Sequence, residues 1–411
     1  MKTYDTRVAV LGAGLQGACV ALELARRGID VTLVDQDALA LNRASLRNEG
    51  KIHLGLVYAN DPTLATARLQ LEGALAFRRL LARWIGVAAD RLTRSTPFHY
   101  LVARDSLLDA EAIRQHYEAI QNLYEERRRD PDADYLGMRP PLLYRPVALG
   151  DLASAVRTER FSAAFATAEV AIDPDQLARD IRSALADAPR IRFLSARRVE
   201  AVERANGRFR VEGSGPDGPW RLLADQVVNA TWESRRALDE ALGVDGSGDR
   251  VLRLRYRLIA RMPVELRGTP SITMVLGPFG DVVVRADGTA YLSWYPAGLR
   301  GWSHAVEPPA AWQGPCRGER SDEADEITDA ILLGIDAWLP GIARAEPLVV
   351  DAGIIVAAGR TDISDRTSGL HERTKVGVIS VAGYHSVDSG KLTTAPLFAL
   401  AAATAVADGL A

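Results

Sequence analysis

The sequence VAVLGAGLQGACVALELARRGIDVTLVD, residues 8–35, decides the fold. A short apolar run over 7–11 predicts a buried strand, and a glycine-rich turn over 12–17 follows it. Apolar residues at helical spacing predict a helix over 15–27, which Gly28 closes. The apolar run over 30–34 predicts a second strand. This strand–helix–strand order is typical of the start of a parallel sheet.

Three glycines of this stretch have the G-x-G-x-x-G spacing of dinucleotide-binding folds. The first allows a tight turn, the second lets the backbone approach a pyrophosphate, and the third lets helix and strand pack closely. The helix N-terminus then faces the phosphates. Asp35 ends the second strand, where a carboxylate accepts hydrogen bonds from ribose hydroxyls and disfavours NADP. The pattern predicts a site for FAD or NAD with contacts from Gly12, Ala13, Gly14, Leu15, Gln16, Gly17, Asp35 and Gln36.

The composition is that of a globular protein. Of 411 residues, 47% are hydrophobic, and 50 basic residues balance 53 acidic ones, so we expect no nucleic-acid partner. The two cysteines, Cys19 and Cys316, predict neither a disulfide framework nor a metal site, and the six histidines have no metal-ligand spacing. No signal-peptide pattern is present, and the longest apolar stretch, 395–407, is too short to span a bilayer. We expect a cytoplasmic protein without a metal or a transmembrane segment.

The remaining sequence predicts two domains. Helices are expected over 63–85, 107–129, 175–188 and 327–339, and strands over 191–194, 198–202, 209–212, 227–231 and 376–381. Between 252 and 295, strands at 252–260, 272–276, 281–285 and 291–295 follow one another without helices. The expected fold is α/β: a Rossmann-like cofactor domain with a parallel sheet and an inserted, mainly antiparallel substrate domain. We assign 1–85, 150–240 and 345–411 to the first domain, and 86–149 and 241–344 to the second.

Three further segments resemble the D-amino-acid-oxidase superfamily of FAD-dependent oxidoreductases. Residues 44–58, ASLRNEGKIHLGLVY, are similar to the N-S-x-x-I-H-x-G pattern of 2-hydroxyglutarate oxidases and the K-L-I-H-G-G pattern of flavin-linked glycerol-3-phosphate dehydrogenases. Residues 227–234, VVNATWES, are similar to V-V-N-A-T-G-x-W-S, and residues 383–396, GYHSVDSGKLTTAP, contain the GKLTT of the same dehydrogenases. The resemblance implies FAD, bound non-covalently in preference to a histidine link. The implied contacts are Ala44, Ser45, Asn48, Glu49, Gly50, Val199, Ala230, Thr231, Gly383, Gly390, Lys391, Leu392 and Thr393.

Two departures from the superfamily concern the site. Trp232 follows Thr231 directly, at the position where the superfamily carries a glycine. The stretch 353–356, GIIV, stands where the superfamily has G-x-R-P, so the arginine that often binds a substrate anion is absent there. Arg360 is a candidate to replace it at a shifted spacing. Glycerol 3-phosphate is therefore not the expected substrate.

Two residues are the first candidates for the chemistry. The resemblance places His53 beside the flavin ring, where an imidazole suits proton removal because it titrates near physiological pH. Alternatively, its ring is bonded to the backbone and shapes the turn. Lys391 precedes a final helix with Thr394 as its expected N-cap, and the lysine and the helix end would stabilise a reduced flavin. Alternatively, Lys391 is a surface cation.

Further candidates come from the same loop and from the predicted antiparallel strands. His385, with Asp388, lines the site or holds the backbone of its own loop. Arg257 is expected to pair with a carboxylate or a phosphate. The aromatic residues Tyr256, Trp294 and Tyr295 either cover the flavin or pack in the core.

The sequence thus predicts an FAD-dependent oxidoreductase. It is expected to oxidise a C–N or C–OH bond of a small polar metabolite by hydride transfer to flavin N5. Oxygen, a quinone or another protein is expected to take the electrons. Two alternatives stay open, namely an NAD-dependent dehydrogenase of the same fold and a flavin-binding protein without turnover.

Overall fold

A computed structural model of the protein describes residues 1–244 and 248–410. Its first sheet has the order β16-β17-β9-β1-β2-β6, and β8 and β7 continue from β9 as an antiparallel meander. The strands from β17 to β6 are parallel, whereas β16 is antiparallel to β17. The bounds are β1 Lys2–Leu11, β2 Val31–Val34, β6 Ile191–Leu194, β7 Arg198–Ala205, β8 Arg208–Gly215, β9 Gly218–Asn229, β16 Gly377–Val381 and β17 Tyr384–Asp388.

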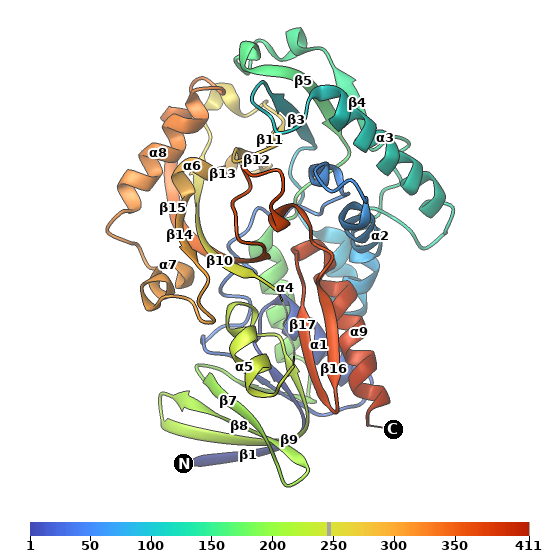
Figure 1. The fold of residues 1–411 in the computed structure, drawn as a ribbon, viewed down its shortest axis with the longest axis vertical. Helices are drawn as coiled ribbons and strands as arrows, with labels where there is room; N and C mark the ends of the chain where they lie inside the picture. Colours follow the sequence, from blue (N-terminus) through green and yellow to red (C-terminus); the bar gives the residue numbers. More distant parts are fainter. Residues whose placement is uncertain (245–247, 411) are drawn as a thin grey trace.

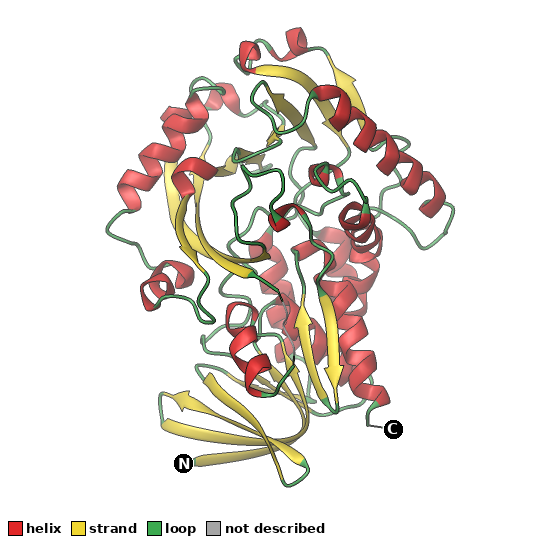
Figure 2. Cartoon of the chain, in the orientation of Figure 1, coloured by secondary structure: helices red, strands yellow, loops and turns green. Residues whose placement is uncertain are grey.

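Four helices pack together beside this sheet (Figures 1 and 2). They are α1 Leu15–Arg26, α2 Ala65–Ile85, α4 Pro174–Ala186 and α9 Ala395–Asp408. All ten residues from Leu15 to Leu24 in α1 are buried, because this helix lies between the sheet and the other three helices. Such a helix is mostly apolar all round, and the buried Glu23 is paired with Arg26, Arg27 and Arg83. The main hydrophobic core of the protein lies in this layer.

The second sheet is mainly antiparallel, with the order β14-β10-β13-β12-β11-β3-β5-β4 and with β15 paired to β10. Only β11 and β3 are parallel among the described pairs of this sheet. A second core lies between this sheet and α8. The strands are β3 Phe98–Ala103, β4 Tyr144–Val147, β5 Phe161–Thr167, β10 Arg250–Arg261, β11 Ser271–Val275, β12 Gly280–Val284, β13 Thr289–Trp294, β14 Leu299–Ser303 and β15 Glu346–Ala358, and the other helices are α3 Ala110–Arg127, α5 Arg235–Ala241, α6 Tyr295–Gly298, α7 Gln313–Arg317 and α8 Ala324–Asp336.

The predicted α/β fold, with a parallel and a mainly antiparallel sheet, is confirmed. The predicted loop after Gly383 is wrong, because Tyr384–Asp388 forms β17 and pairs with both β9 and β16. Strands β3, β4, β5, β14 and β15 were not predicted. Their partners are distant in sequence, as for β3, which pairs with β11. These segments form strands because they pair with distant segments, and no local sequence pattern indicates such pairing.

The sheets divide the chain differently from the predicted boundaries at two places. Strand β5 lies in 150–240 and β15 lies in 345–411, yet both belong to the second sheet. We therefore propose to count these strands with the substrate domain. Residues 245–247 of the predicted substrate domain and Ala411 of the predicted cofactor domain lie outside the described residues.

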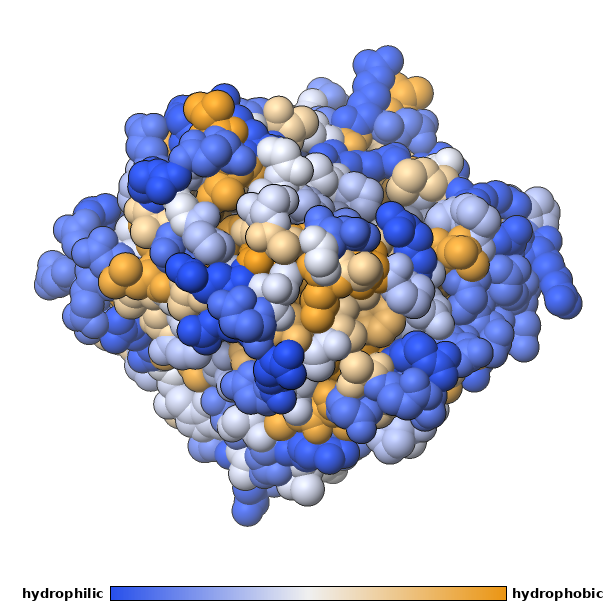
Figure 3. Space-filling view, turned by 90° about the horizontal axis from the view of Figure 1, so that it is seen from above, coloured by the Kyte–Doolittle hydropathy of each residue, from blue (hydrophilic) through white to orange (hydrophobic). Residues whose placement is uncertain are grey.

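The surface seen from above is mostly hydrophilic, with hydrophobic side chains grouped nearer its centre (Figure 3). In residues 1–244 and 248–410, no helix is long and apolar enough to cross a membrane. The same described residues contain no group of three or more His, Cys, Asp or Glu side chains that could hold a metal ion.

Candidate functional site

A cavity of about 1900 Å³, open solvent included, joins the carboxyl ends of β1, β2 and β9 to the second sheet. This is where open α/β sheets bind ligands. The predicted residues that line it are Gly12, Gly14, Leu15, Gln16, Asp35, Gln36, Ala44, Ser45, Asn48, Glu49, His53, Val199, Ala230, Thr231, Arg257, Gly390, Lys391 and Leu392. The predicted residues outside its lining are Ala13, Gly17, Gly50, Gly383, His385 and Thr393.

The glycine turn is shaped by close backbone contacts. A Cβ atom at Gly12 would lie 2.5 Å from the carbonyl oxygen of Ala230, and Gly12 has a φ of +90°, which L side chains rarely adopt. A Cβ atom at Gly17 would lie 1.9 Å from the carbonyl oxygen of Gly12, so Gly17 allows α1 to pack on the turn. Because α1 begins at Leu15, the amides of its first turn lack helical partners; the Leu15 N–H is bonded to the Ser45 hydroxyl, and a helix start of this kind is a favourable place for an anion.

Asp35 fixes the turn from the end of β2. Its carboxylate accepts hydrogen bonds from the backbone N–H groups of Ala13, at 2.6 Å, and Asp37, at 2.8 Å. Burial raises the pKa of Asp35 to about 6, and the two amides only partly offset this effect. A ligand hydroxyl at this carboxylate would supply a further hydrogen bond to its charged form.

The second predicted segment packs directly on the first. The hydroxyl of Ser45 accepts a hydrogen bond from the N–H of Leu15 at 2.9 Å. The side chain of Asn48 donates to the carbonyl oxygen of Ala44 at 3.0 Å and accepts from the N–H of Gly50 at 2.8 Å. A Cβ atom at Gly50 would lie 2.0 Å from the carbonyl oxygen of Ile172, so Gly50 serves the packing of this segment.

Trp232 keeps the backbone conformation that a glycine would supply at its position. Its φ is +55°, in the left-handed region, where a non-glycine residue costs about 1–2 kcal/mol. The indole lines the cavity and donates from Nε1 to the carbonyl oxygen of Ile354 at 2.8 Å. The superfamily glycine is thus replaced by a residue that joins the end of β9 to β15.

His385 and Gly383 lie away from the cavity. The Nε2 atom of His385 is 2.8 Å from Oε1 of Gln226, and its Nδ1 atom is 2.8 Å from the hydroxyl of Ser380. Burial lowers the pKa of His385 to about 4. Gly383, with a φ of +86°, forms the turn between β16 and β17. The catalytic role predicted for His385 is not supported, because both ring nitrogens already have partners outside the cavity.

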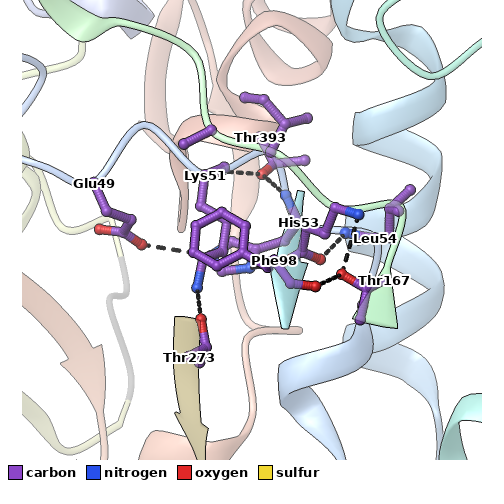
Figure 4. A network of polar contacts seen from close by, with 12 residues as sticks. Glu49, Lys51, His53, Leu54, Phe98, Thr167, Thr273 and Thr393 are labelled. Atoms are coloured by element: carbon purple, nitrogen blue, oxygen red, sulfur yellow. Dashed lines mark hydrogen bonds and ion pairs between the residues drawn. The ribbon is translucent and has the colours of Figure 1, made fainter. Parts of the chain in front are cut away.

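His53 lies between the carboxylates of Glu169 and Glu49, and Figure 4 labels it together with Glu49. Its Nδ1 atom is 3.5 Å from Oε1 of Glu169, and its Nε2 atom is 3.7 Å from Oε1 of Glu49. Neither ring nitrogen has a hydrogen-bond partner among the described residues, although the side chain is only 5% exposed. The backbone N–H of His53 donates to the hydroxyl of Thr393 at 2.9 Å. The ring is therefore not bonded to the backbone, which was the alternative to a catalytic role.

Two lysines stand beside the Glu49 carboxylate. The Lys51 ammonium lies 2.8 Å from the Asp281 carboxylate and 4.2 Å from the centre of the Phe98 ring. Burial lowers the pKa of Lys391 to about 8, although the charge of Glu49 acts in the opposite direction. Burial would raise the pKa of Glu49, but the His53 ring and the two lysines hold it well below its usual range. Lys391 thus lines the cavity beside an ionised carboxylate.

Arg257 serves the architecture of the site. Its guanidinium binds both oxygens of the Asp351 carboxylate, at 2.7 and 3.3 Å, and donates to the carbonyl oxygen of Leu46 at 2.9 Å. All these partners belong to the protein, so the structure gives Arg257 the role of holding segment 44–58 against β10. Its predicted pairing with a substrate anion stays a prediction.

Two other arginines of β10 have fewer partners. Arg255 lines the cavity and donates to the hydroxyl of Ser293 at 2.8 Å, and its nearest carboxylate, Asp281, is 3.8 Å away. Arg253 donates to the hydroxyl of Tyr295 at 3.2 Å, and its buried Nε atom has no partner among the described residues. The strand register places Arg253 opposite Ile355, Arg255 opposite Gly353 and Arg257 opposite Asp351. These pairs lie on one face of the sheet, since side chains alternate along a strand.

The remaining predicted residues lie outside the cavity. Tyr256 is buried in the second core, and Trp294 packs on Gly334 of α8. Arg360 is 75% exposed and pairs with Asp249 at 2.7 Å, so it does not replace the missing arginine. Thr394 is at the N-cap position of α9, but its hydroxyl donates to backbone carbonyls and caps no amide. Asp388, the last residue of β17, accepts hydrogen bonds from Arg235 of α5, from Arg250 of β10 and from the backbone N–H of Gly390.

Sequence reasoning missed several residues of this site, among them Lys51, Glu169, Arg255 and Tyr291. Arg255 has a local signal, because Arg253, Arg255 and Arg257 alternate along a predicted strand and so share one face. Glu169 has no such signal, since it reaches His53 only through the fold.

Several solved structures share the fold of this protein. The structure is similar to glycine oxidase from Geobacillus kaustophilus, with a TM-score of 0.67, 14% identity and coverage of 98% of this chain and 95% of that chain. It is also similar to L-alpha-glycerophosphate oxidase from Mycoplasma pneumoniae with FAD bound, with a TM-score of 0.65, 15% identity and coverage of 99% and 95%. Iminodiacetate oxidase from Chelativorans sp. has a TM-score of 0.64, 19% identity and coverage of 98% and 95%.

Two sequence matches complete the comparison. Over 74 residues the chain is 42% identical to the tRNA 5-methylaminomethyl-2-thiouridine biosynthesis bifunctional protein MnmC of Chromohalobacter salexigens, which is 18% of this chain but only 10% of that protein. The family model described as FAD dependent oxidoreductase matches residues 7–405. This match confirms the predicted superfamily and FAD as its cofactor, and it sets aside the NAD-dependent alternative. The chain therefore belongs to the family of FAD dependent oxidoreductases.

Proposed function

We propose that this oxidoreductase oxidises the carbon that bears the amine or the hydroxyl in a small organic acid. One observation carries the proposal: a single cavity brings together the dinucleotide turn at Gly12, the unbonded ring of His53 and the guanidinium of Arg255. These are the parts needed to bind a dinucleotide, accept a proton and hold an anion.

The residues of the cavity fit FAD. The turn from Gly12 to Gly17 leads into α1, whose first-turn amides can face a pyrophosphate, and Asp35 offers a carboxylate to the ribose. When bound, FAD supplies the acceptor for the hydride. The protein residues orient the substrate, take up its proton and set the charge of the site.

The charges at the second sheet support an acidic substrate. The Asp351 carboxylate pairs with Arg257 at 2.7 Å and with Arg47 at 3.0 Å, whereas the described carboxylate nearest to Arg255 lies at 3.8 Å. An arginine at a cavity without a close counterion favours a carboxylate or phosphate ligand. In this proposal Arg255, one strand away from Ile355, takes the role of the arginine that the G-x-R-P segment lacks.

The proton that leaves the substrate amine or hydroxyl is assigned to His53. Its ring lines the cavity, and Nε2 is on the side of Glu49, which also lines the cavity. An imidazole in this position can accept the N–H or O–H proton as the C–H bond breaks.

The proposal is tested by anaerobic mixing of the holoprotein with matched pairs of compounds. Suitable acids are glycine, L-proline, iminodiacetate and 2-hydroxyglutarate, each compared with its amide, and loss of the flavin absorption band reports reduction. We expect reduction by an acid and at least tenfold slower reduction by its amide. Equal rates for an acid and its amide would contradict the anion site.

A second prediction concerns Lys391. Lys391→Met is expected to lower the flavin reduction potential, because a cation near the reduced ring stabilises its negative charge. Since the pKa of Lys391 is lowered to about 8, the cation is present below pH 8 and is lost above it. The difference between wild type and variant should therefore shrink as the pH rises through this value. Dye-equilibration titrations measure the potentials, with exposed Lys375→Met as the control, and equal potentials below pH 8 would disprove this role.

Two further assignments belong to the proposal. Oxygen, a quinone or another protein takes the electrons from the reduced enzyme. A cytoplasmic location agrees with Cys19 and Cys316, which are both free and buried.

A further inference from the structure

We propose that Glu169 is the positioning residue of His53: it accepts the Nδ1–H of the ring and so presents the unprotonated Nε2 atom to the cavity. This inference rests on the proposed function for the use that the reaction makes of His53. The orientation of the ring itself is a separate property and can be measured without a substrate.

Glu169 is fixed from several sides. It follows β5 and is completely buried. One carboxylate oxygen accepts a hydrogen bond from the N–H of Leu54 at 2.7 Å, and the other accepts from the hydroxyl of Tyr100 and lies 3.5 Å from Nδ1 of His53. Its own N–H donates to the hydroxyl of Thr167, and its carbonyl oxygen accepts from the N–H of Phe98. The carboxylate therefore has little freedom to move relative to the ring.

The charge of Glu169 has few other sources of compensation. A buried carboxylate without a cation is costly, and the Lys51 ammonium is already bound to Asp281 at 2.8 Å. Burial would raise the pKa of Glu169, but the His53 ring, Lys51 and the Tyr100 hydroxyl lower it below its usual range. Glu169 is thus an anion that stabilises a proton at Nδ1, both in the neutral ring and in the charged ring formed after proton uptake.

The Nε2 side of the His53 ring has a more exposed carboxylate than the Nδ1 side. Glu49 lies 3.7 Å from Nε2, and its side chain is 22% exposed at the cavity. Lys391 and Lys51 also compensate its charge, so Glu49 depends less on a proton from His53. The other titratable neighbour is Tyr58, whose ring meets the imidazole edge-on at 5.6 Å between centroids. Among the carboxylates of the described residues, Glu169 alone is both completely buried and within 4 Å of Nδ1.

Histidine-selective nitrogen-15 NMR of the FAD-loaded protein at neutral pH tests this orientation. The chain has six histidines, and the signals lost in His53→Gln assign the ring. We expect His53 to carry its proton at Nδ1, and Glu169→Gln to shift a large part of the population to the Nε2–H form. Tyr100→Phe, which keeps the carboxylate, should leave the wild-type pattern. An Nε2–H ring or a doubly protonated ring in the wild type, or an unchanged ring in Glu169→Gln, would overturn the proposal.

A kinetic measurement gives a second readout. Glu169→Gln should lower the rate of flavin reduction at least tenfold, as loss of the orienting carboxylate does in catalytic triads. It should also move the acid limb of the pH–rate profile to lower pH, because the charged ring is less stabilised. A lower Tm with the acid limb unmoved would show a merely structural role. If Glu169→Gln does not fold, Glu169→Asp serves instead, because its shorter side chain moves the negative charge away from Nδ1. This variant should give a tautomer population between those of the Nδ1–H and Nε2–H rings. A wild-type tautomer population in Glu169→Asp would overturn the proposal.

The two proposals fail in different ways. If His53→Gln reduces flavin at the wild-type rate while the NMR result stands, the base role of His53 is wrong and the positioning by Glu169 holds. If the tautomer is independent of Glu169 while His53→Gln is slow, the positioning is wrong and the base role holds.

Discussion

Replacement of His53 by glutamine is expected to lower the rate constant of flavin reduction by about 10²- to 10⁴-fold, the usual contribution of a general base. Glutamine is of similar size, and its backbone N–H keeps the 2.9 Å bond to Thr393. The loss should therefore appear in the reduction step while FAD content and Tm stay near their wild-type values. Anaerobic stopped-flow mixing with an acid that reduces the wild type measures this rate constant.

The matched control for His53 is His304→Gln, because His304 is exposed and lies outside the lining of the cavity. The control should reduce flavin at the wild-type rate. An unimpaired His53→Gln enzyme would return His53 to a structural role and leave proton removal to solvent or to Glu49.

Arg255→Met is expected to weaken binding of the acid by about 10- to 100-fold, because a hydrogen bond to a charged group contributes about 1.5–3 kcal/mol. The effect should fall mainly on KM, since the arginine holds a group that does not change during the reaction. The affinity for the amide of the same acid should change little. Steady-state kinetics with the acid and its amide separates these effects.

The control for Arg255 is Arg360→Met. This variant removes an exposed guanidinium that follows the stretch 353–356, where the superfamily arginine is missing. It should leave both kinetic constants unchanged. If Arg255→Met binds the acid as tightly as the wild type, the anion lies elsewhere, and Arg253, which is opposite Ile355 on β10, becomes the next candidate.

The part of the site that could be predicted from sequence consists of residues that are close together in the chain. The three glycines and Asp35 lie within residues 12–35, and their spacing alone indicates the turn, the helix end and the carboxylate that the structure shows. The missing superfamily glycine was also visible in the sequence. The structure adds two facts that the sequence does not show: Trp232 has the left-handed backbone conformation, and its indole donates a hydrogen bond to the carbonyl oxygen of Ile354.

The residues that the sequence did not reveal depend on contacts between distant segments. Glu169 reaches His53 across 116 positions (53 to 169), because β5 and segment 44–58 meet beside the second sheet. The role proposed for Arg255 depends on the pairing of β10 with β15, which places Arg255 one strand away from the stretch that lacks the superfamily arginine. His385 was misplaced for the same reason, since β17 inserts between β9 and β16 and directs this ring at Gln226.

The absorption spectrum of the purified, desalted protein, followed by that of the supernatant after acid precipitation, tests the central claim most directly. We predict a two-banded flavin spectrum and complete release of FAD into the supernatant, because the glycine turn, Asp35 and Lys391, which line the cavity, are proposed to hold the cofactor without a covalent link. Flavin retained in the pellet would contradict non-covalent binding and point to His53 as the attachment site. A colourless protein that does not take up added FAD would contradict the account as a whole.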